Sequence, residues 1–236
     1  PILKASGLNT VISASEETYA AQSVRDFEGY QAAEVLPLVG QWNTHTYSAT
    51  TQARSQISAL CKEQGIRLWM SEVGSGGSGI AGNLNLAQKL MDDIRYIMPV
   101  AWVDWQYVEE GNDQWCLVQG DFTKQTYHKV KNYSIRQHFS KFIRPGYTFL
   151  TSLNGQTLAA RNPEGDSLII VAINPNALPV VHRADLSFYE SISSELTALR
   201  SSETEDLSPT ADYTLEDRIL TYKLPAYSIV TFVIPV

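Results

Sequence analysis

The chain has 236 residues, a length that allows one large domain or two small ones. Of these residues 44% are hydrophobic and 18% charged, a composition typical of globular proteins. Its formal net charge of −7 and isoelectric point near 5.1 argue against nucleic acid and anionic membranes as partners, because no basic stripe is present to neutralise phosphates. The sequence has no apolar run of about eighteen residues and no charged-then-apolar leader, so it predicts neither a membrane span nor a signal peptide.

The first 140 residues alternate short apolar strands with helical periodicity. The predicted strands cover residues 7–13, 39–43, 66–71 and 100–107, and the predicted helices cover 18–36, 51–64, 83–98 and 127–139. Four such units in succession predict a parallel sheet with right-handed crossovers, and no glycine-rich nucleotide-binding motif is present. Polar and aromatic residues follow every strand, as in a (β/α)₈ barrel, but a full barrel needs about 250 residues, so only half of one is expected.

The pattern changes to period 2 from about Arg144 onward. The predicted strands there cover residues 147–153, 156–161, 167–174, 181–188, 196–200, 218–224 and 227–234, with a solvated loop over 201–212. Short strands at even spacing are typical of an antiparallel sandwich. The predicted fold is therefore α/β plus all-β, with half a barrel over residues 1–142 and a β-sandwich over 143–236.

Four groups of chemistry-bearing residues follow the predicted barrel strands. They are Glu16 with Glu17, His45 with Tyr47, Glu72, and the segment Trp102, Asp104, Trp105 and Gln106. In α/β barrels the ends of the strands share one cleft, and catalytic side chains collect there. Glu72 ends an apolar strand and precedes the glycine-rich segment 74–79, a position that suits a nucleophile or an acid/base.

Each of these residues also has a structural interpretation. A glutamate at a strand end is often a surface or salt-bridged group, and His45 can cap a helix or satisfy a loop. Alternation along the strand puts Trp102 and Gln106 on one side and Trp105 on the other, so spacing alone does not place both tryptophans in a cleft. One of Glu16 and Glu17 is interpreted as a first-turn helix acid. Three further histidines, His128, His138 and His182, are interpreted as surface or helix groups, and Cys61 as a buried free thiol.

Several ordered motifs resemble glycoside hydrolase family 30, which includes glucosylceramidases, glucuronoxylan endo-xylanases and endo-β-1,6-galactanases. The most specific is Phe139-Ser140-Lys141-Phe142-Ile143-Arg144-Pro145-Gly146, which resembles the family's junction between barrel and sandwich. The segments 224–228 and 230–232 resemble its closing sandwich strand. The segments 45–47, 68–74 and 104–106 are similar, in order, to its sixth, seventh and eighth barrel strands. The resemblance covers essentially the whole chain and implies the C-terminal half of the barrel.

Carried over residue by residue, the resemblance implies that Glu72 is the catalytic nucleophile of a retaining β-glycoside hydrolase. The implied substrate-binding residues are His45 and Tyr47 as hydrogen-bonding partners, Trp105 as a wall of the −1 sugar site, Trp102 and Gln106 as cleft residues, and Glu17 as a substrate contact. A carbohydrate is then the expected ligand, with no metal and no organic cofactor. Enzymes of this kind are secreted, periplasmic or lysosomal.

The chain departs from the family pattern in one large respect. The family's acid/base is a glutamate in an Asn-Glu-Pro-like segment after the fourth barrel strand, and this sequence contains no such segment. The first four strands are also missing, and the abrupt start at Pro1 predicts a piece of a longer, nicked or split enzyme. We therefore expect the missing N-terminal half as a partner, in the same or another chain, and no turnover by this chain alone. The alternatives are an inactive carbohydrate-binding or scaffolding fragment and a barrel enzyme of another glycosidase family.

Overall fold

The computed structural model describes residues 2–74 and 77–236, so Ser75 and Gly76 of the predicted glycine-rich loop lie outside the described residues. The chain divides into two compact units, residues 1–74 with 92–105 and residues 75–91 with 106–236. A parallel α/β part followed by an antiparallel β part, the coarse architecture expected from the sequence, is confirmed. The expected domain boundary at residue 142 stays a prediction. In the part of the chain that the structure describes, no helix is long and apolar enough to cross a bilayer.

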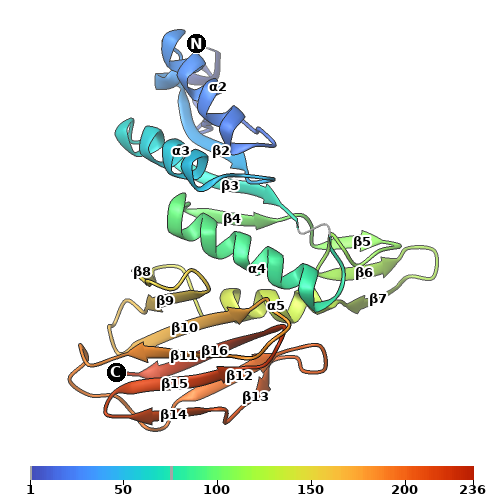
Figure 1. Ribbon diagram of the computed structural model, residues 1–236. Coiled ribbons are helices and arrows are strands. Elements are labelled where there is room, and N and C mark those ends of the chain that lie inside the picture. Colours follow the sequence, from blue (N-terminus) through green and yellow to red (C-terminus); the bar gives the residue numbers. More distant parts are fainter. Residues whose placement is uncertain (1, 75–76) are drawn as a thin grey trace. The chain divides into compact units, whose positions relative to one another are not determined.

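The first unit contains a four-stranded parallel sheet in the order β1-β2-β3-β4. Its strands β2, β3 and β4 follow one another in Figure 1. Its elements are α1 (Ile2–Ala5), β1 (Ile12–Ser13), α2 (Ala20–Ala32), the 3₁₀ helix η1 (Leu36–Leu38), β2 (Val39–His45), α3 (Thr51–Glu63), β3 (Arg67–Val73) and β4 (Ala101–Asp104). Helix α4 (Gly79–Tyr96) contributes residues to both units. The strand expected over residues 7–13 was predicted too long, because within this segment only residues 12 and 13 pair with β2. The helix expected over 18–36 ends at Ala32, since Glu34 takes a positive φ of 58°.

Burial of one tryptophan fixes the face of β2 that packs against helix α2. Trp42 is fully buried, its ring lies 4.8 Å from that of Phe27, and its indole nitrogen donates to Ser23 Oγ over 2.8 Å. Because side chains alternate along a strand, Asn43 and His45 point to the opposite face from Trp42. Helix α3 follows, with Thr50 as its N-cap, accepting from the amide of Ala53.

The second unit contains three sheets (Figure 1). Six antiparallel strands lie in the order β13-β12-β16-β10-β9-β8, and three more antiparallel strands lie in the order β11-β15-β14. The third sheet has the order β5-β6-β7, in which β5 is parallel to β6 and β7 is antiparallel to it. The elements are β5 (Val108–Glu110), β6 (Val118–Asp121), β7 (Thr126–Lys129), α5 (Lys131–Ser140), β8 (Thr148–Leu150), β9 (Thr157–Arg161), β10 (Ser167–Asn174), β11 (Val180–Asp185), β12 (Thr197–Ser201), β13 (Ser208–Pro209), β14 (Tyr213–Glu216), β15 (Ile219–Leu224) and β16 (Ser228–Pro235). The helix expected from residue 127 begins at Lys131, because residues 126–129 pair with β6 instead.

A hydrophobic core of the second unit draws on the six-stranded sheet and on the sheet β11-β15-β14. Ile170, Phe232 and Val230 from the six-stranded sheet pack with Leu220 and Tyr222 from the three-stranded one. Side chains of β16 that point the other way are buried as well, since this strand contacts helix α5. Burial on both faces explains why β10 and β16 read as nearly continuous apolar runs.

The interpretation of His138 as a surface or helix group was wrong about its exposure. This histidine lies in helix α5 but is fully buried. Its ring nitrogens lie 2.7 Å from Thr231 Oγ1 of β16 and 2.8 Å from Ser201 Oγ of β12. Burial lowers the pKa of His138 from 6.5 to about 3. The expected burial of Cys61 as a free thiol is confirmed.

Candidate active site

Glu72 is the next-to-last residue of β3, and it lies at the carboxyl end of the parallel sheet of the first unit. The neighbouring strand β2 ends at His45, which pairs with Glu72 across a local irregularity in the register. Glu72 keeps 26% of its side chain exposed, whereas His45 keeps 9%. The carboxylate is therefore accessible, while the group beside it is held in place by its surroundings.

Two side chains from the end of β2 approach the same oxygen of Glu72. The phenol of Tyr47 donates to Glu72 Oε1 over 3.2 Å, and His45 Nδ1 lies 3.6 Å from that oxygen, within ion-pair distance. Burial and the negative charge of Glu72 raise the pKa of Tyr47 to about 12, so the phenol remains a proton donor at neutral pH. The rings of His45 and Tyr47 meet edge to face at 6.0 Å.

A second carboxylate, Glu16, lies on the other side of the His45 ring. Glu16 Oε1 is 3.1 Å from His45 Nε2, and Glu16 Oε2 accepts from Asn43 Nδ2 over 2.9 Å. The hydroxyl of Ser71, the residue before Glu72, also donates to Glu16. His45 therefore lies between two carboxylates, one at the end of β3 and one in the segment after β1. Such an arrangement holds the imidazole in one orientation.

The sequence favoured Glu17 as the substrate contact, whereas the structure brings Glu16 to His45. The backbone carbonyl of Glu17 accepts from the amide of His45 over 2.8 Å, but its side chain lies beside Asp26 of α2, whose proximity raises the pKa of Glu17. No local signal separates the two acids, because the choice depends on how the segment after β1 lies against β2. Asn43 and Ser71 were not singled out from the sequence either.

The three predicted residues on and after β4 lie in different surroundings. Trp105 follows the strand directly, its amide donates to the carbonyl of Val73 over 3.0 Å, and its side chain is 44% exposed. Trp102 pairs with Met70 of β3, and its indole nitrogen donates to Asp93 Oδ2 of α4 over 2.9 Å. Trp102 is therefore directed to the helix side of the sheet, away from the face of His45. Gln106 belongs to the second unit, where its carbonyl accepts from the amide of Leu117.

Comparison with known proteins points to one group of enzymes, although no protein-family model matches the chain. The sequence is 27% identical over 173 residues to an endo-beta-1,6-galactanase of Hypocrea rufa, a match that covers 73% of this chain and 35% of the relative. It is 27% identical over 250 residues to glucuronoxylanase XynC of Bacillus subtilis, covering 98% of this chain and 54% of the relative.

Solved structures give the same answer for the fold. The catalytic domain of GH30 xylanase C from Talaromyces cellulolyticus matches with a TM-score of 0.75 at 22% identity, over 99% of this chain and 54% of that one. A GH30 endoxylanase from Clostridium papyrosolvens C71 matches with a TM-score of 0.76 at 20% identity, over 98% of this chain and 58% of that one. The chain resembles glycoside hydrolase family 30 in both sequence and fold.

This likeness to family 30 extends over nearly the whole chain but over only part of each relative. The chain spans about a third of the galactanase and about half of the glucuronoxylanase that it matches. The recognition made from the motifs at residues 45–47, 68–74 and 139–146 is thus confirmed, and the activity is taken up as a proposal below.

Proposed function

We propose that this chain is the part of a retaining β-glycoside hydrolase that carries the catalytic nucleophile, and that Glu72 is this nucleophile. The observation that carries the proposal is the position of Glu72 at a strand end, with Tyr47 and His45 directed at one of its oxygens. A phenol that donates to one carboxylate oxygen orients the group and leaves the other oxygen to meet a substrate. The family resemblance supports the same role for this residue.

The reaction would proceed by two displacements at the anomeric carbon. A Glu72 oxygen attacks this carbon and forms a glycosyl ester, while the glycosidic C–O bond breaks and an acid protonates the departing oxygen. Water then attacks the same carbon, the acid, now a base, takes its proton, and the ester bond returns its electrons to the Glu72 carboxylate. The product keeps the configuration of the substrate.

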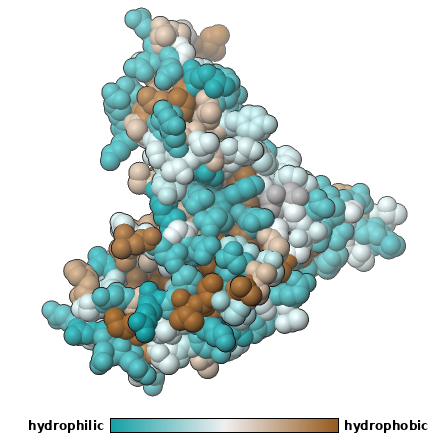
Figure 2. Space-filling model, viewed as in Figure 1, coloured by the Kyte–Doolittle hydropathy of each residue, from teal (hydrophilic) through white to brown (hydrophobic). Residues whose placement is uncertain are grey.

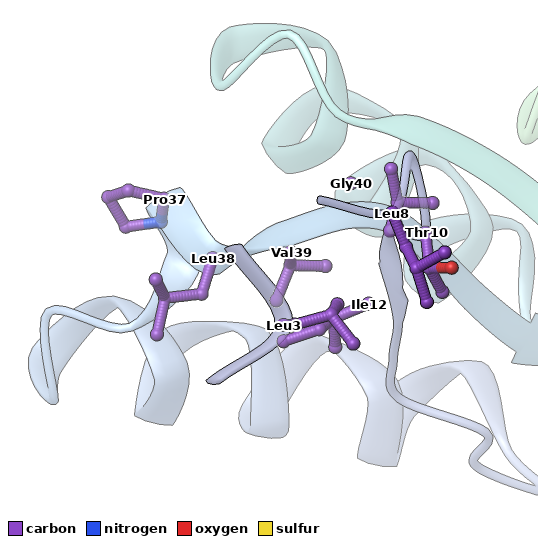
Figure 3. A pocket seen from close by; sticks show the side chains of 9 residues that line it. Leu3, Leu8, Thr10, Ile12, Pro37, Leu38, Val39 and Gly40 are labelled. Atoms are coloured by element: carbon purple, nitrogen blue, oxygen red, sulfur yellow. The ribbon is translucent and has the colours of Figure 1, made fainter. Parts of the chain in front are cut away.

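We place the acid/base outside this chain, in an N-terminal portion that completes the barrel. The sequence has no Asn-Glu-Pro segment, and the chain covers between 35% and 58% of each relative described above. An apolar cavity of about 530 Å³ beside β1 and η1 agrees with a missing neighbour (Figure 3). Leu3, Leu8, Ile12 and Leu38 point into it, and each is more than a third exposed. Further barrel strands would cover these side chains.

Within the site, Trp105 would stack on the apolar face of a sugar ring, and His45 would bond a hydroxyl. We favour an uncharged polymer such as a β-1,6-galactan over a glucuronic-acid-bearing xylan. The segment 106–126 holds Glu109, Glu110, Asp113 and Asp121, and its sole basic residue, Lys124, pairs with Asp121 at 2.8 Å. A glucuronate carboxylate is best recognised by an unpaired Arg or Lys. Because polysaccharides do not cross membranes, we place the activity in a secreted or periplasmic enzyme.

The test compares Glu72→Gln with the wild type in the complete protein, on β-1,6-galactan, glucuronoxylan and aryl β-glycosides. We expect kcat to fall by at least about 10⁴-fold, the scale on which loss of a covalent nucleophile acts. Glu63→Gln, at the exposed end of α3, is the matched control and should keep full activity. Hydrolysis at the wild-type rate by Glu72→Gln rules out the assignment. Undiminished sugar affinity with no hydrolysis by either protein would instead favour a binding module.

A further inference from the structure

Asp93 is a fully buried carboxylate near the C-terminal end of helix α4, and all of its described partners belong to the first unit. Arg54 Nε of α3 donates to Asp93 Oδ1 over 2.7 Å. Thr46 Oγ1 and the Trp102 indole nitrogen donate to Asp93 Oδ2 over 2.8 and 2.9 Å. Three elements and the segment after β2 therefore meet at one side chain.

The positions of these partners connect Asp93 to Glu72 from two sides. Thr46 lies between His45 and Tyr47, the two residues whose side chains reach Glu72 Oε1. Trp102 lies on β4, which pairs with β3 on the edge opposite to β2. Asp93 thus ties together the strands that flank the one carrying Glu72.

Arg54 extends the same network into the turn that follows Tyr47. Its Nη1 donates to the carbonyl of Ala49 over 2.6 Å, and the amide of Ala49 in turn donates to the carbonyl of Thr46 over 3.2 Å. Arg54 is 5% exposed, so the ion pair with Asp93 is removed from water. A buried ion pair adds little net stability compared with apolar packing, and its better-supported role is to fix one arrangement of the chain.

From this network we infer that Asp93 is a positioning residue, which sets the 45–47 segment so that Tyr47 and His45 meet Glu72. The inference rests on the proposed role of Glu72, and Asp93 itself touches neither Glu72 nor the site of the substrate. Removing the contacts of Asp93 leaves the nucleophile in place but frees the 45–47 segment, whose side chains orient it. The expected consequence is slower chemistry with little change in sugar binding.

Thr46→Val and Thr46→Ser form the most selective pair of variants. Valine keeps the shape of threonine and removes only the hydroxyl that reaches Asp93, whereas serine keeps that hydroxyl. Asp93→Asn removes the charge, and Asp92→Asn is its control, because Asp92 lies on the same helix turn, 30% exposed and 3.9 Å from Arg95. In the complete protein, Thr46→Val should lower kcat by about tenfold to a hundredfold with KM nearly unchanged, as for a misplacement of about 1 Å.

A readout independent of activity uses the complete protein with tyrosine labelled by ¹³C at the ζ carbon. The Tyr47 phenol, identified by its loss in Tyr47→Phe, is followed by NMR against pH. Its pKa of about 12 should move toward the ordinary value of 10.0 in Thr46→Val and Asp93→Asn, and stay in Thr46→Ser and Asp92→Asn. If Asp93→Asn does not fold, the Tyr47 titration and kcat of Thr46→Val alone decide the test.

The two readouts separate the inference from the function on which it rests. An unchanged Tyr47 titration in folded Thr46→Val and Asp93→Asn overturns the positioning role, whatever the activity. The Tyr47 titration can shift in Thr46→Val and Asp93→Asn while Glu72→Gln keeps full activity. Asp93 then positions Tyr47, but Glu72 is not the nucleophile and the expected effect on catalysis is wrong.

Discussion

At the scale of single residues, His138 makes the stability of the second unit depend on pH. The buried imidazole has a pKa of about 3, against 6.5 for an ordinary histidine, so the unfolded chain binds a proton below pH 6.5 that the folded chain does not bind. The stability that the neutral His138 side chain contributes is complete above pH 6.5 and is lost as the pH falls toward 3. The free energy of unfolding should therefore fall by up to about 1.4 kcal/mol per pH unit from this residue.

Urea unfolding of wild type and His138→Gln between pH 7.5 and 5 measures this contribution. Burial also lowers the pKa of His182, so the difference between the two proteins, rather than the wild-type slope, isolates His138. We expect a shallower slope for the variant. Equal slopes would contradict this account, because they mean that His138 takes up its proton in the folded protein as it does in the unfolded chain.

The sequence identified several residues of the site because strand ends are visible in it. Glu72, His45 and Tyr47 each follow an apolar strand and belong to ordered motifs, and the structure brings them together. Glu16 was grouped with Glu17 but not chosen as the contact, and Asp93 was not singled out, because their contacts depend on register and on helix orientation. Neither leaves a local pattern: an acid beside another acid, or one in an amphipathic helix, most simply reads as a solvated group.

At the scale of elements, the packing of α2 on β2 depends on Trp42. Its ring meets Phe27 at 4.8 Å and Tyr30 at 5.2 Å, and its indole nitrogen bonds Ser23. Trp42→Ala should cost about 3–5 kcal/mol of unfolding free energy, as large aromatic truncations in cores do. Trp105→Ala, at a residue that is 44% exposed, is the control and should cost about 0.5 kcal/mol or less. Thermal and urea unfolding measure both, and equal losses would contradict this account of the packing.

Elements with strong periodicity were predicted closely, and short ones were not. The strand expected at 167–174 and the helix expected at 51–64 match β10 (Ser167–Asn174) and α3 (Thr51–Glu63) almost to the residue, since each carries a long regular pattern. The small sheet β5-β6-β7 lies between the strand expected at 100–107 and the first residues of the helix expected at 127–139, where no strand was predicted. Its strands have three or four residues each, too few to show a period.

At the scale of the whole molecule, the first unit leaves apolar side chains uncovered around β1. Leu8, Val11 and Ile12 are 65%, 52% and 43% exposed, and apolar residues are visible at the surface among the N-terminal elements in Figure 2. An exposed edge with apolar neighbours favours association with other chains. The 236-residue chain alone should therefore self-associate and lack glycosidase activity.

Sedimentation velocity over a concentration series tests the self-association. The wild-type sedimentation coefficient should rise with concentration, and the double variant Leu8→Lys with Val11→Lys should abolish the rise. Leu153→Lys, at a fully exposed leucine of the second unit, should not. A wild-type chain that stays monomeric throughout contradicts the view that this face has a missing neighbour.

The central claim, that Glu72 is the nucleophile, is tested most directly by trapping the glycosyl ester. The complete protein is incubated with 2-deoxy-2-fluoro-β-galactosyl and β-xylosyl fluorides, whose leaving group needs no acid, and is digested with trypsin. The tryptic peptide 68–89 contains Glu72 as its sole carboxylate side chain, so an adduct on it is unambiguous. We predict one fluorosugar on that peptide and loss of activity in step with labelling. Inactivation with the label on a peptide that lacks Glu72 would contradict the account.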